Sequence, residues 1–246
     1  MKTIILAGGR GSRISEYTRA IPKPMIKIGY KPILIHIIEH YVNYGHEDFY
    51  LALGYKSKII QNYFKKFKKF DKAFKHKVGN LDISITLSFT GLNTLTGGRI
   101  KKMKKFIDKN ESFMFTYGDG ISDVNLKKLQ DFHKKNNTIC TVTAVRPPAR
   151  FGEITLLKNM VKTFKEKPQV AEGWINGGFF VAKYDFFNLI KGDTTILEKE
   201  PLEKATLRKQ LSAFKHYGFW KCMDTSRDKE VLENIYKKNK FNWLKI

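Results

Sequence analysis

Three glycines and two arginines directly follow a short apolar run near the start of the chain, in the stretch ILAGGRGSR (residues 5–13). Glycine lets the backbone bend sharply and approach a ligand closely, and the planar guanidinium of arginine suits phosphate oxygens. A tight turn alone needs no arginine, so Arg10 and Arg13 indicate a loop that binds a polyanion. The stretch is not a Walker A motif, and it is not a complete dinucleotide fingerprint, because the third glycine position holds Ile14.

A lysine and two aspartates are further candidates for phosphate chemistry. Lys23 lies between two prolines in IPKPM, and the prolines stiffen the backbone that presents it. Asp119 follows an apolar run in FTYGDG, and Asp224 lies in GFWKCMDTSRD. Their carboxylates could hold Mg²⁺ through oxygen, although a turn or a helix cap accounts equally well for either string. Sequence spacing does not show whether the two aspartates meet in space.

Two later strings, FKEKP and WINGGFF, contain groups that could bind a phosphorylated sugar. Lys167 could hold a phosphate, while Glu166 and Asn176 could form hydrogen bonds with sugar hydroxyls. Gly177 would permit a ligand to approach a strand closely. A β-bulge and a surface charge pair are the structural alternative for these strings.

Hydrophobic periodicity predicts alternating strands and helices in the first half of the chain. This βαβ alternation predicts an α/β fold with a doubly wound, mostly parallel sheet, in which ligands bind beyond the carboxyl ends of the strands. The glycine-rich loop and Asp119 both fall at such ends. The predicted strands are residues 3–6, 49–55, 82–89, 112–120 and 138–145, and the predicted helices are residues 32–44, 56–70, 97–107 and 125–136.

The second half of the chain shows a different pattern. Small β elaborations mix there with short helices, including a strand at 173–182 and a closing helix at 225–239. No linker composition and no internal repeat interrupts the sequence, so residues 1–246 are expected to form a single domain.

Composition limits the other classes of function. The chain has 246 residues and a net charge of +23, from 46 basic and 23 acidic residues, which makes nucleic acid an alternative partner. The lysines mostly occupy the solvent faces of predicted helices, no nucleic-acid-binding module is recognisable, and no apolar run is long enough to span a membrane. Neither nucleic acid nor a membrane is therefore expected as a partner. Two cysteines without pairing or metal spacing favour a reduced, cytoplasmic protein.

The strings LAGGRGSR, PKPM and GYKPIL together resemble the signature of the sugar-1-phosphate nucleotidyltransferases. The later strings NTLTGGRIKK, FTYGDGISD, PPARFGE, FKEKP, GWINGGFFV and GFWKCMDTSRDKEVLE are similar, in the same order, to those of the glucose-1-phosphate cytidylyltransferases within that family. The resemblance covers nearly the whole chain. It implies a Rossmann-like nucleotidyltransferase fold and an enzyme that joins CTP and α-D-glucose 1-phosphate, with Mg²⁺, into CDP-glucose and pyrophosphate for surface-sugar synthesis.

The resemblance also implies roles for individual residues. Arg13 and Lys23 would act on the phosphates as catalytic residues, and Asp119 and Asp224 would bind Mg²⁺. Family members assemble as homo-oligomers, often hexamers, so an oligomer is expected. The nucleotide would contact Leu6, Ala7, Gly8, Gly9, Arg10, Gly11, Ser12, Arg13, Lys23, Thr94 and Arg99, and the sugar phosphate would contact Glu166, Lys167, Asn176 and Gly177.

Three positions depart from the family pattern. Arg10 stands where the family more often has an apolar residue, Ser12 where it has threonine, and Phe89 where it usually has an aspartate. These departures bear on base selection and on an oligomer contact, not on phosphate chemistry. The alternatives that stay open are the same chemistry with dTTP, UTP or another sugar 1-phosphate, a nicotinamide-dependent oxidoreductase, and a basic nucleic-acid-binding protein.

Overall fold

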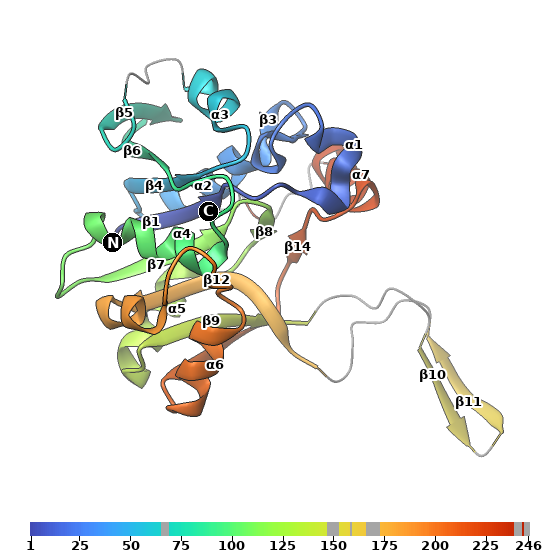
Figure 1. Ribbon diagram of the computed structural model, residues 1–246. Coiled ribbons are helices and arrows are strands. Elements are labelled where there is room, and N and C mark those ends of the chain that lie inside the picture. Colours follow the sequence, from blue (N-terminus) through green and yellow to red (C-terminus); the bar gives the residue numbers. More distant parts are fainter. Residues whose placement is uncertain (65–68, 147–152, 158, 166–172, 239–242, 244–246) are drawn as a thin grey trace.

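An eight-stranded β-sheet forms the centre of the structure, a computed structural model that describes residues 1–64, 69–146, 153–157, 159–165, 173–238 and 243 (Figure 1). From one edge to the other, its strands are β13 (Leu211–His216), β9 (Cys140–Val145), β12 (Ile175–Lys183), β7 (Ser112–Tyr117), β1 (Thr3–Ala7), β4 (Asp48–Leu53), β6 (Leu81–Phe89) and β5 (Ala73–Val78). Only β12 and β5 run antiparallel to their neighbours. The predicted mostly parallel sheet is therefore confirmed.

Helices cover both faces of the sheet. Successive residues of a strand face opposite sides, and both faces are apolar, so each needs a covering layer. In β1, Ile5 and Ala7 join one apolar cluster, which also contains Leu232 near the C-terminus. Ile4 and Leu6 join a second cluster on the other face. The helices are α1 (Ser15–Thr18), α2 (Ile33–Val42), α3 (Ser57–Tyr63), α4 (Thr96–Lys102), α5 (Leu126–Asn136), α6 (Glu200–Leu207) and α7 (Ser226–Lys237), with 3₁₀ turns η1 (Ser12–Ile14), η2 (Lys23–Met25), η3 (Met103–Phe106) and η4 (Tyr184–Leu189).

Three short two-stranded ladders complete the described chain. β2 (Lys27–Ile28) pairs with β3 (Lys31–Pro32), and β8 (Gly120–Ser122) pairs with β14 (Trp220–Cys222). The hairpin of β10 (Glu153–Leu157) and β11 (Met160–Lys165) lies away from the central sheet in Figure 1. Among the residues described, no helix is both long and apolar enough to cross a membrane.

The structure corrects the predicted helix at 56–70. Helix α3 ends at Tyr63 and begins after Lys56, whose φ of 50° places it in the left-handed region. Beyond the undescribed residues 65–68 the chain turns again at Asp71, which has a φ of 62°. The sequence analysis also missed β5, β13 and α6. Strands β5 and β13 lie at the two edges of the sheet, where no side is fully buried and apolar alternation is weak.

Candidate active site

The glycine-rich loop leaves β1 at the carboxyl edge of the sheet, as predicted. Gly11 has a φ of 63°, and a Cβ there would lie 2.9 Å from Thr18 Cγ2 and 3.1 Å from Lys23 Cβ. Thr18 Oγ1 donates a hydrogen bond to the Gly11 carbonyl at 3.0 Å. Only glycine fits this conformation without strain, and the turn brings the backbone of the loop directly against Lys23.

Arg99 holds the start of the same loop, at Gly8, through hydrogen bonds from its side chain. Its buried guanidinium donates to the carbonyl oxygens of Gly8 at 2.9 Å, Leu53 at 3.0 Å and Gly91 at 2.9 Å, and to Thr90 Oγ1 at 2.6 Å. These acceptors lie at the end of β4 and directly after the ends of β1 and β6. Arg99 therefore ties together the ends of three parallel strands, and a large part of its hydrogen-bonding capacity is used within the protein.

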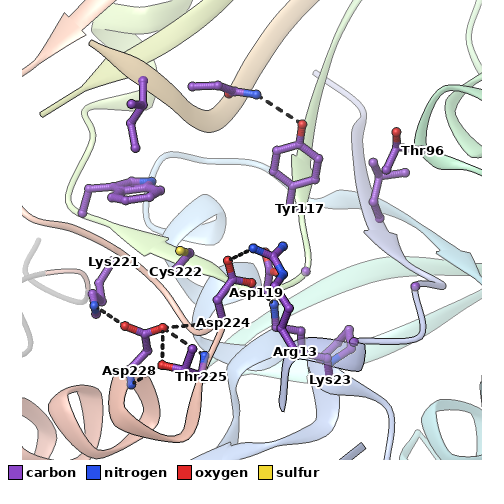
Figure 2. A pocket seen from close by; sticks show the side chains of 18 of the residues that line it. Arg13, Lys23, Thr96, Tyr117, Asp119, Lys221, Cys222, Asp224, Thr225 and Asp228 are labelled. Carbon is purple, nitrogen blue, oxygen red and sulfur yellow. Dashed lines mark hydrogen bonds and ion pairs between the residues drawn. The ribbon is translucent and has the colours of Figure 1, made fainter. Parts of the chain in front are cut away.

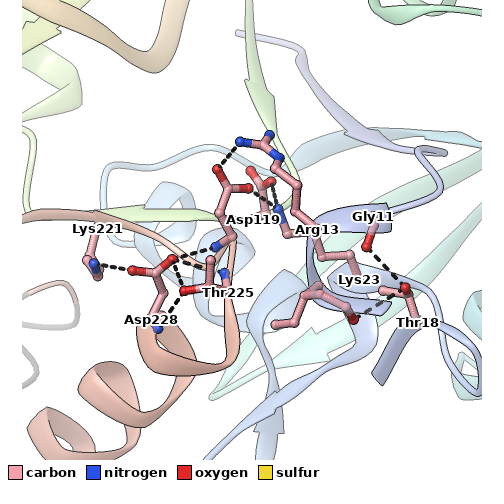
Figure 3. A network of polar contacts seen from close by, with 10 residues as sticks. Gly11, Arg13, Thr18, Lys23, Asp119, Lys221, Thr225 and Asp228 are labelled. Atoms are coloured by element: carbon pink, nitrogen blue, oxygen red, sulfur yellow. Dashed lines mark hydrogen bonds and ion pairs between the residues drawn. The ribbon is translucent and has the colours of Figure 1, made fainter. Parts of the chain in front are cut away.

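Lys23, Asp119 and Asp224 form a compact cluster beside the loop. Figure 3 shows Lys23 and Asp119 of this cluster together with Gly11 and Arg13 of the loop. Lys23 Nζ lies 2.5 Å from Asp119 Oδ2 and 2.6 Å from Asp224 Oδ1. The pairing of β8 with β14 explains why the two aspartates meet, because Met223 N donates to the Asp119 carbonyl at 2.9 Å. The tertiary structure thus joins residues that the sequence could not relate to one another.

The two aspartates of this cluster stabilise the charged form of Lys23. Burial alone would lower the pKa of Lys23, but the charges and hydrogen bonds of Asp119 and Asp224 outweigh it and raise this pKa above its usual value. Arg13 Nη1 lies 2.6 Å from Asp224 Oδ2, although the Arg13 side chain is 73% exposed. Water screens that second pair, so it adds little to stability and leaves Arg13 accessible to a ligand.

The start of α7 holds Asp224 in place. Asp228 Oδ2 accepts hydrogen bonds from the backbone amides of Asp224 at 3.1 Å and Thr225 at 2.9 Å, and the Asp228 amide donates to Thr225 Oγ1 at 3.2 Å. This reciprocal capping box satisfies amides at the helix N-terminus. Lys221 pairs with the same carboxylate. These contacts hold the backbone that carries Asp224 against the start of α7.

The donors of the cluster suit Mg²⁺. Two carboxylate oxygens approach a single cationic atom, and Mg²⁺ prefers such oxygen ligands, keeping several waters in addition. Within the described part of the chain no group of three or more histidine, cysteine or acidic residues could hold a metal. Asp119 and Asp224 offer carboxylate oxygens that could hold such an ion, with phosphate oxygens and water as its remaining ligands.

A large cavity of about 1640 Å³ opens over the cluster and the loop (Figure 2). Of the predicted site residues, Ala7, Arg10, Ser12 and Gly177 are not in its lining, and Glu166 and Lys167 lie outside the described residues. The predicted residues that do line it are Leu6, Gly8, Gly9, Gly11, Arg13, Lys23, Thr94, Arg99, Asp119, Asn176 and Asp224.

Contacts outside the cavity lining are seen for three of these positions, whereas Ser12 lies in the 3₁₀ turn η1. Ala7 is buried in the core, and Arg10 Nη2 donates to Asn93 Oδ1 at 3.3 Å. The Gly177 carbonyl accepts a hydrogen bond from Trp220 Nε1 at 2.7 Å. A Cβ on Gly177 would lie 2.7 Å from Val145 Cγ1, so this glycine allows β12 to pack closely against β9.

The sequence analysis missed several residues of the lining. Tyr117, Thr96 and Glu198 form a hydrogen-bonded polar group in the lining, and Trp220 lines the cavity as well. Tyr117 directly precedes the GDG string, which was a usable signal. Glu198 lies in a segment without a recognisable motif, so only the tertiary structure places it here.

The sheet, the glycine-rich loop and the facing cation–carboxylate cluster define an α/β protein suited to binding a nucleoside phosphate. The chain belongs to the nucleotidyl transferase family, whose model matches residues 2–224. It is 42% identical over 253 residues to the glucose-1-phosphate cytidylyltransferase of Salmonella typhimurium, covering 99% of this chain and 98% of that protein.

More distant matches, one in sequence and two in fold, carry other names. The mannose-1-phosphate guanyltransferase of Saccharomyces cerevisiae is 31% identical over 239 residues, which cover 94% of this chain and 63% of that protein. The crystal structure of HddC from Yersinia pseudotuberculosis superposes with a TM-score of 0.72 at 22% identity, covering 96% of this chain and 99% of that one. A UDP-glucose pyrophosphorylase complexed with UDP-glucose gives a TM-score of 0.70 at 19% identity, covering 97% and 98%.

Proposed function

We propose that this protein joins CTP and α-D-glucose 1-phosphate into CDP-glucose and pyrophosphate. The choice of substrates rests on the 42% identity, along nearly the whole of both chains, to a protein named for that reaction. The observation that carries the chemistry is the cluster in which Lys23 Nζ lies within 2.6 Å of both Asp119 and Asp224, directly in front of the glycine-rich loop.

The cluster fits an in-line attack of the sugar phosphate on the α-phosphorus of the nucleotide. A phosphate monoester is already ionised at neutral pH, so the reaction needs no general base. It needs two anions to be held side by side, and this requires positioning and charge neutralisation. Lys23 and Arg13 supply fixed positive charge, and the loop from Gly8 to Gly11 supplies backbone amides.

Asp119 and Asp224 would hold Mg²⁺ beside the same phosphates. When bound, the ion would neutralise part of the negative charge that develops on the transferring phosphoryl group. In that state Lys23 would exchange its carboxylate partners for phosphate oxygens, within reach of its present position. Arg99 would act on the nucleotide through the loop that it fixes.

The sugar phosphate would lie on the β12 side of the cavity. Asn176 lines the cavity there, and Gly177 shapes the strand beneath it. Glu166 and Lys167 complete this side in the proposal, as residues carried over from the family motif. A homo-oligomer in the cytoplasm is the proposed state of the protein, again by analogy with the family.

The test is a panel of nucleoside triphosphates and sugar 1-phosphates with Mg²⁺, read by pyrophosphate release. CTP with glucose 1-phosphate should give the highest kcat/KM. Preference for dTTP, UTP or another sugar would keep the chemistry and overturn the substrates. No pyrophosphate with any pair, together with a salt-dependent shift of an oligonucleotide, would favour nucleic-acid binding instead.

A further inference from the structure

One carboxylate in the cavity differs from the others in its partners. Four acidic side chains line the cavity, and three of them form ion pairs: Asp119 and Asp224 with Lys23, and Asp228 with Lys221. Glu198 has no cationic partner anywhere in the described chain. In a protein with 46 basic residues, this is a specific arrangement and not a shortage of cations.

Two hydroxyl groups hold the Glu198 carboxylate. Tyr117 donates to Oε1, and Thr96 Oγ1 donates to Oε2 at 2.9 Å. Each hydroxyl accepts a hydrogen bond as well, Thr96 from Leu197 N at 2.9 Å and Tyr117 from Asn176 Nδ2 at 3.2 Å. A hydroxyl has a single proton, so both protons are committed to Glu198.

This arrangement keeps Glu198 an acceptor. Burial and the neighbouring Glu198 carboxylate raise the pKa of Tyr117 far above its usual value, so the phenol stays protonated and donates. An ionised carboxylate can accept about four hydrogen bonds, and the protein provides two of them. Acceptor capacity therefore remains on an exposed side chain that lines the cavity.

Charge decides which part of a substrate can meet Glu198. A carboxylate without a cation repels phosphate groups, whereas Lys23 and Arg13 attract them. In Figure 2 the Tyr117 hydroxyl, which marks the Glu198 side, points away from the Lys23 and Asp119 cluster. The group that Glu198 binds is thus an uncharged hydroxyl or amino donor.

The proposed function places the sugar phosphate on the β12 side of the cavity. Contacts between Glu198 and that side therefore favour a sugar over a base as the source of the donor. Tyr117 links Glu198 to Asn176 of β12, and Trp220, which also lines the cavity, donates to the carbonyl of the next residue, Gly177, at 2.7 Å. Carboxylate, amide and indole thus form one connected side of the cavity. We propose that Glu198 selects the sugar, by accepting hydrogen bonds from hydroxyl groups of the sugar 1-phosphate. This assignment rests on the proposed function.

Glu198→Gln tests it, because the amide keeps the shape of the side chain but removes the charge. A hydrogen bond to a charged group contributes enough binding energy that kcat/KM for the sugar 1-phosphate should fall about 10- to 100-fold, with the KM for CTP changed less than about twofold. Glu200→Gln is the matched control, since Glu200 pairs with Lys191 and Lys204 outside the cavity lining and should leave both values unchanged.

A series of deoxy-sugar 1-phosphates makes the test specific. The analogue that lacks the hydroxyl group bound by Glu198 should have a lower kcat/KM than glucose 1-phosphate with the wild type. This difference in kcat/KM should largely disappear in Glu198→Gln. If the variant instead changes only the KM for CTP and its discrimination against UTP, Glu198 reads the cytosine amino group and the proposal is wrong. Unchanged kinetics for both substrates would also overturn it.

The wild-type panel separates this proposal from the proposed function. If the wild type prefers a different nucleotide or sugar, the proposed substrates are wrong. The Glu198→Gln comparison is then made with the preferred pair and its deoxy analogues. A loss confined to the sugar 1-phosphate still supports the role of Glu198, and its absence still refutes it.

Discussion

Lys23 Nζ lies 2.5 Å from Asp119 Oδ2, although 96 residues separate the two in the chain. The same ammonium group lies 2.6 Å from Asp224. In this state Lys23 neutralises both carboxylates that the proposal assigns to Mg²⁺. In the proposed mechanism the lysine and the metal ion would be alternative cations for one pair of carboxylates, and this relationship leads to the first two predictions.

Lys23→Ala should reduce turnover about 100- to 1000-fold, because it removes one preorganised charge from the reacting phosphates. Circular dichroism should show an intact fold. Lys27→Ala is the control, since Lys27 is an exposed residue on β2 and does not line the cavity. Wild-type turnover in a folded Lys23→Ala protein would refute the catalytic role.

Lys23→Met should strengthen metal binding in the absence of nucleotide. The ammonium no longer competes for Asp119 and Asp224, so the Kd for Mn²⁺ should fall about tenfold or more, equivalent to about 1.4 kcal/mol. Electron paramagnetic resonance of free Mn²⁺ measures this directly. Lys23→Arg keeps a cation in place and should bind Mn²⁺ as weakly as the wild type. An identical Kd for Lys23→Met would contradict the competition.

Gly8→Ala should destabilise the fold by about 1–3 kcal/mol through overpacking. A Cβ on Gly8 would lie 2.3 Å from Arg99 Nη1 and 2.8 Å from the backbone nitrogen of Gly54. Arg99 cannot move aside without losing its hydrogen bonds to the strand ends. Gly9→Ala is the control, because a Cβ there has no neighbour within 4 Å. Urea denaturation measures both, and equal stability of the two variants would rule out this clash.

Acid should destabilise the protein through its buried histidines. Burial lowers the pKa of His40 to about 4, despite its hydrogen bond to the Trp243 carbonyl. Above pH 6.5 the imidazole is neutral in both the folded and the unfolded state. Between about pH 6.5 and 4 the unfolded chain binds a proton that the folded chain does not, so His40 alone accounts for a loss of about 3 kcal/mol by pH 4.

Urea denaturation at several pH values measures this loss. His46 and His133, whose pKa values are also lowered to about 4 by burial, should add to the slope. His40→Leu should flatten the dependence of unfolding free energy on pH, whatever its effect on stability at pH 7. A wild-type free energy of unfolding that stays constant from pH 7 to 5 would disprove the assignment.

The sequence by itself determined the class of fold and the glycine-rich loop. Alternating apolar segments fixed the order of strands and helices, because periodicity reflects which face of each element is buried. It could not determine the ends of α3 or the presence of β5 and β13, where burial is partial and the pattern weak. Contacts with other elements decide where such a helix ends and whether such an edge strand forms.

Only the tertiary structure decided how the site is assembled. The pairing of β8 with β14 brings Asp224 to Asp119, and the burial of Arg99 among carbonyl oxygens shows what that residue binds. Glu198 carries no motif, and its place in the cavity follows from its contacts with Tyr117 and Thr96. Motifs record the local backbone geometry of a segment, whereas contacts between distant segments depend on how the whole sheet is ordered.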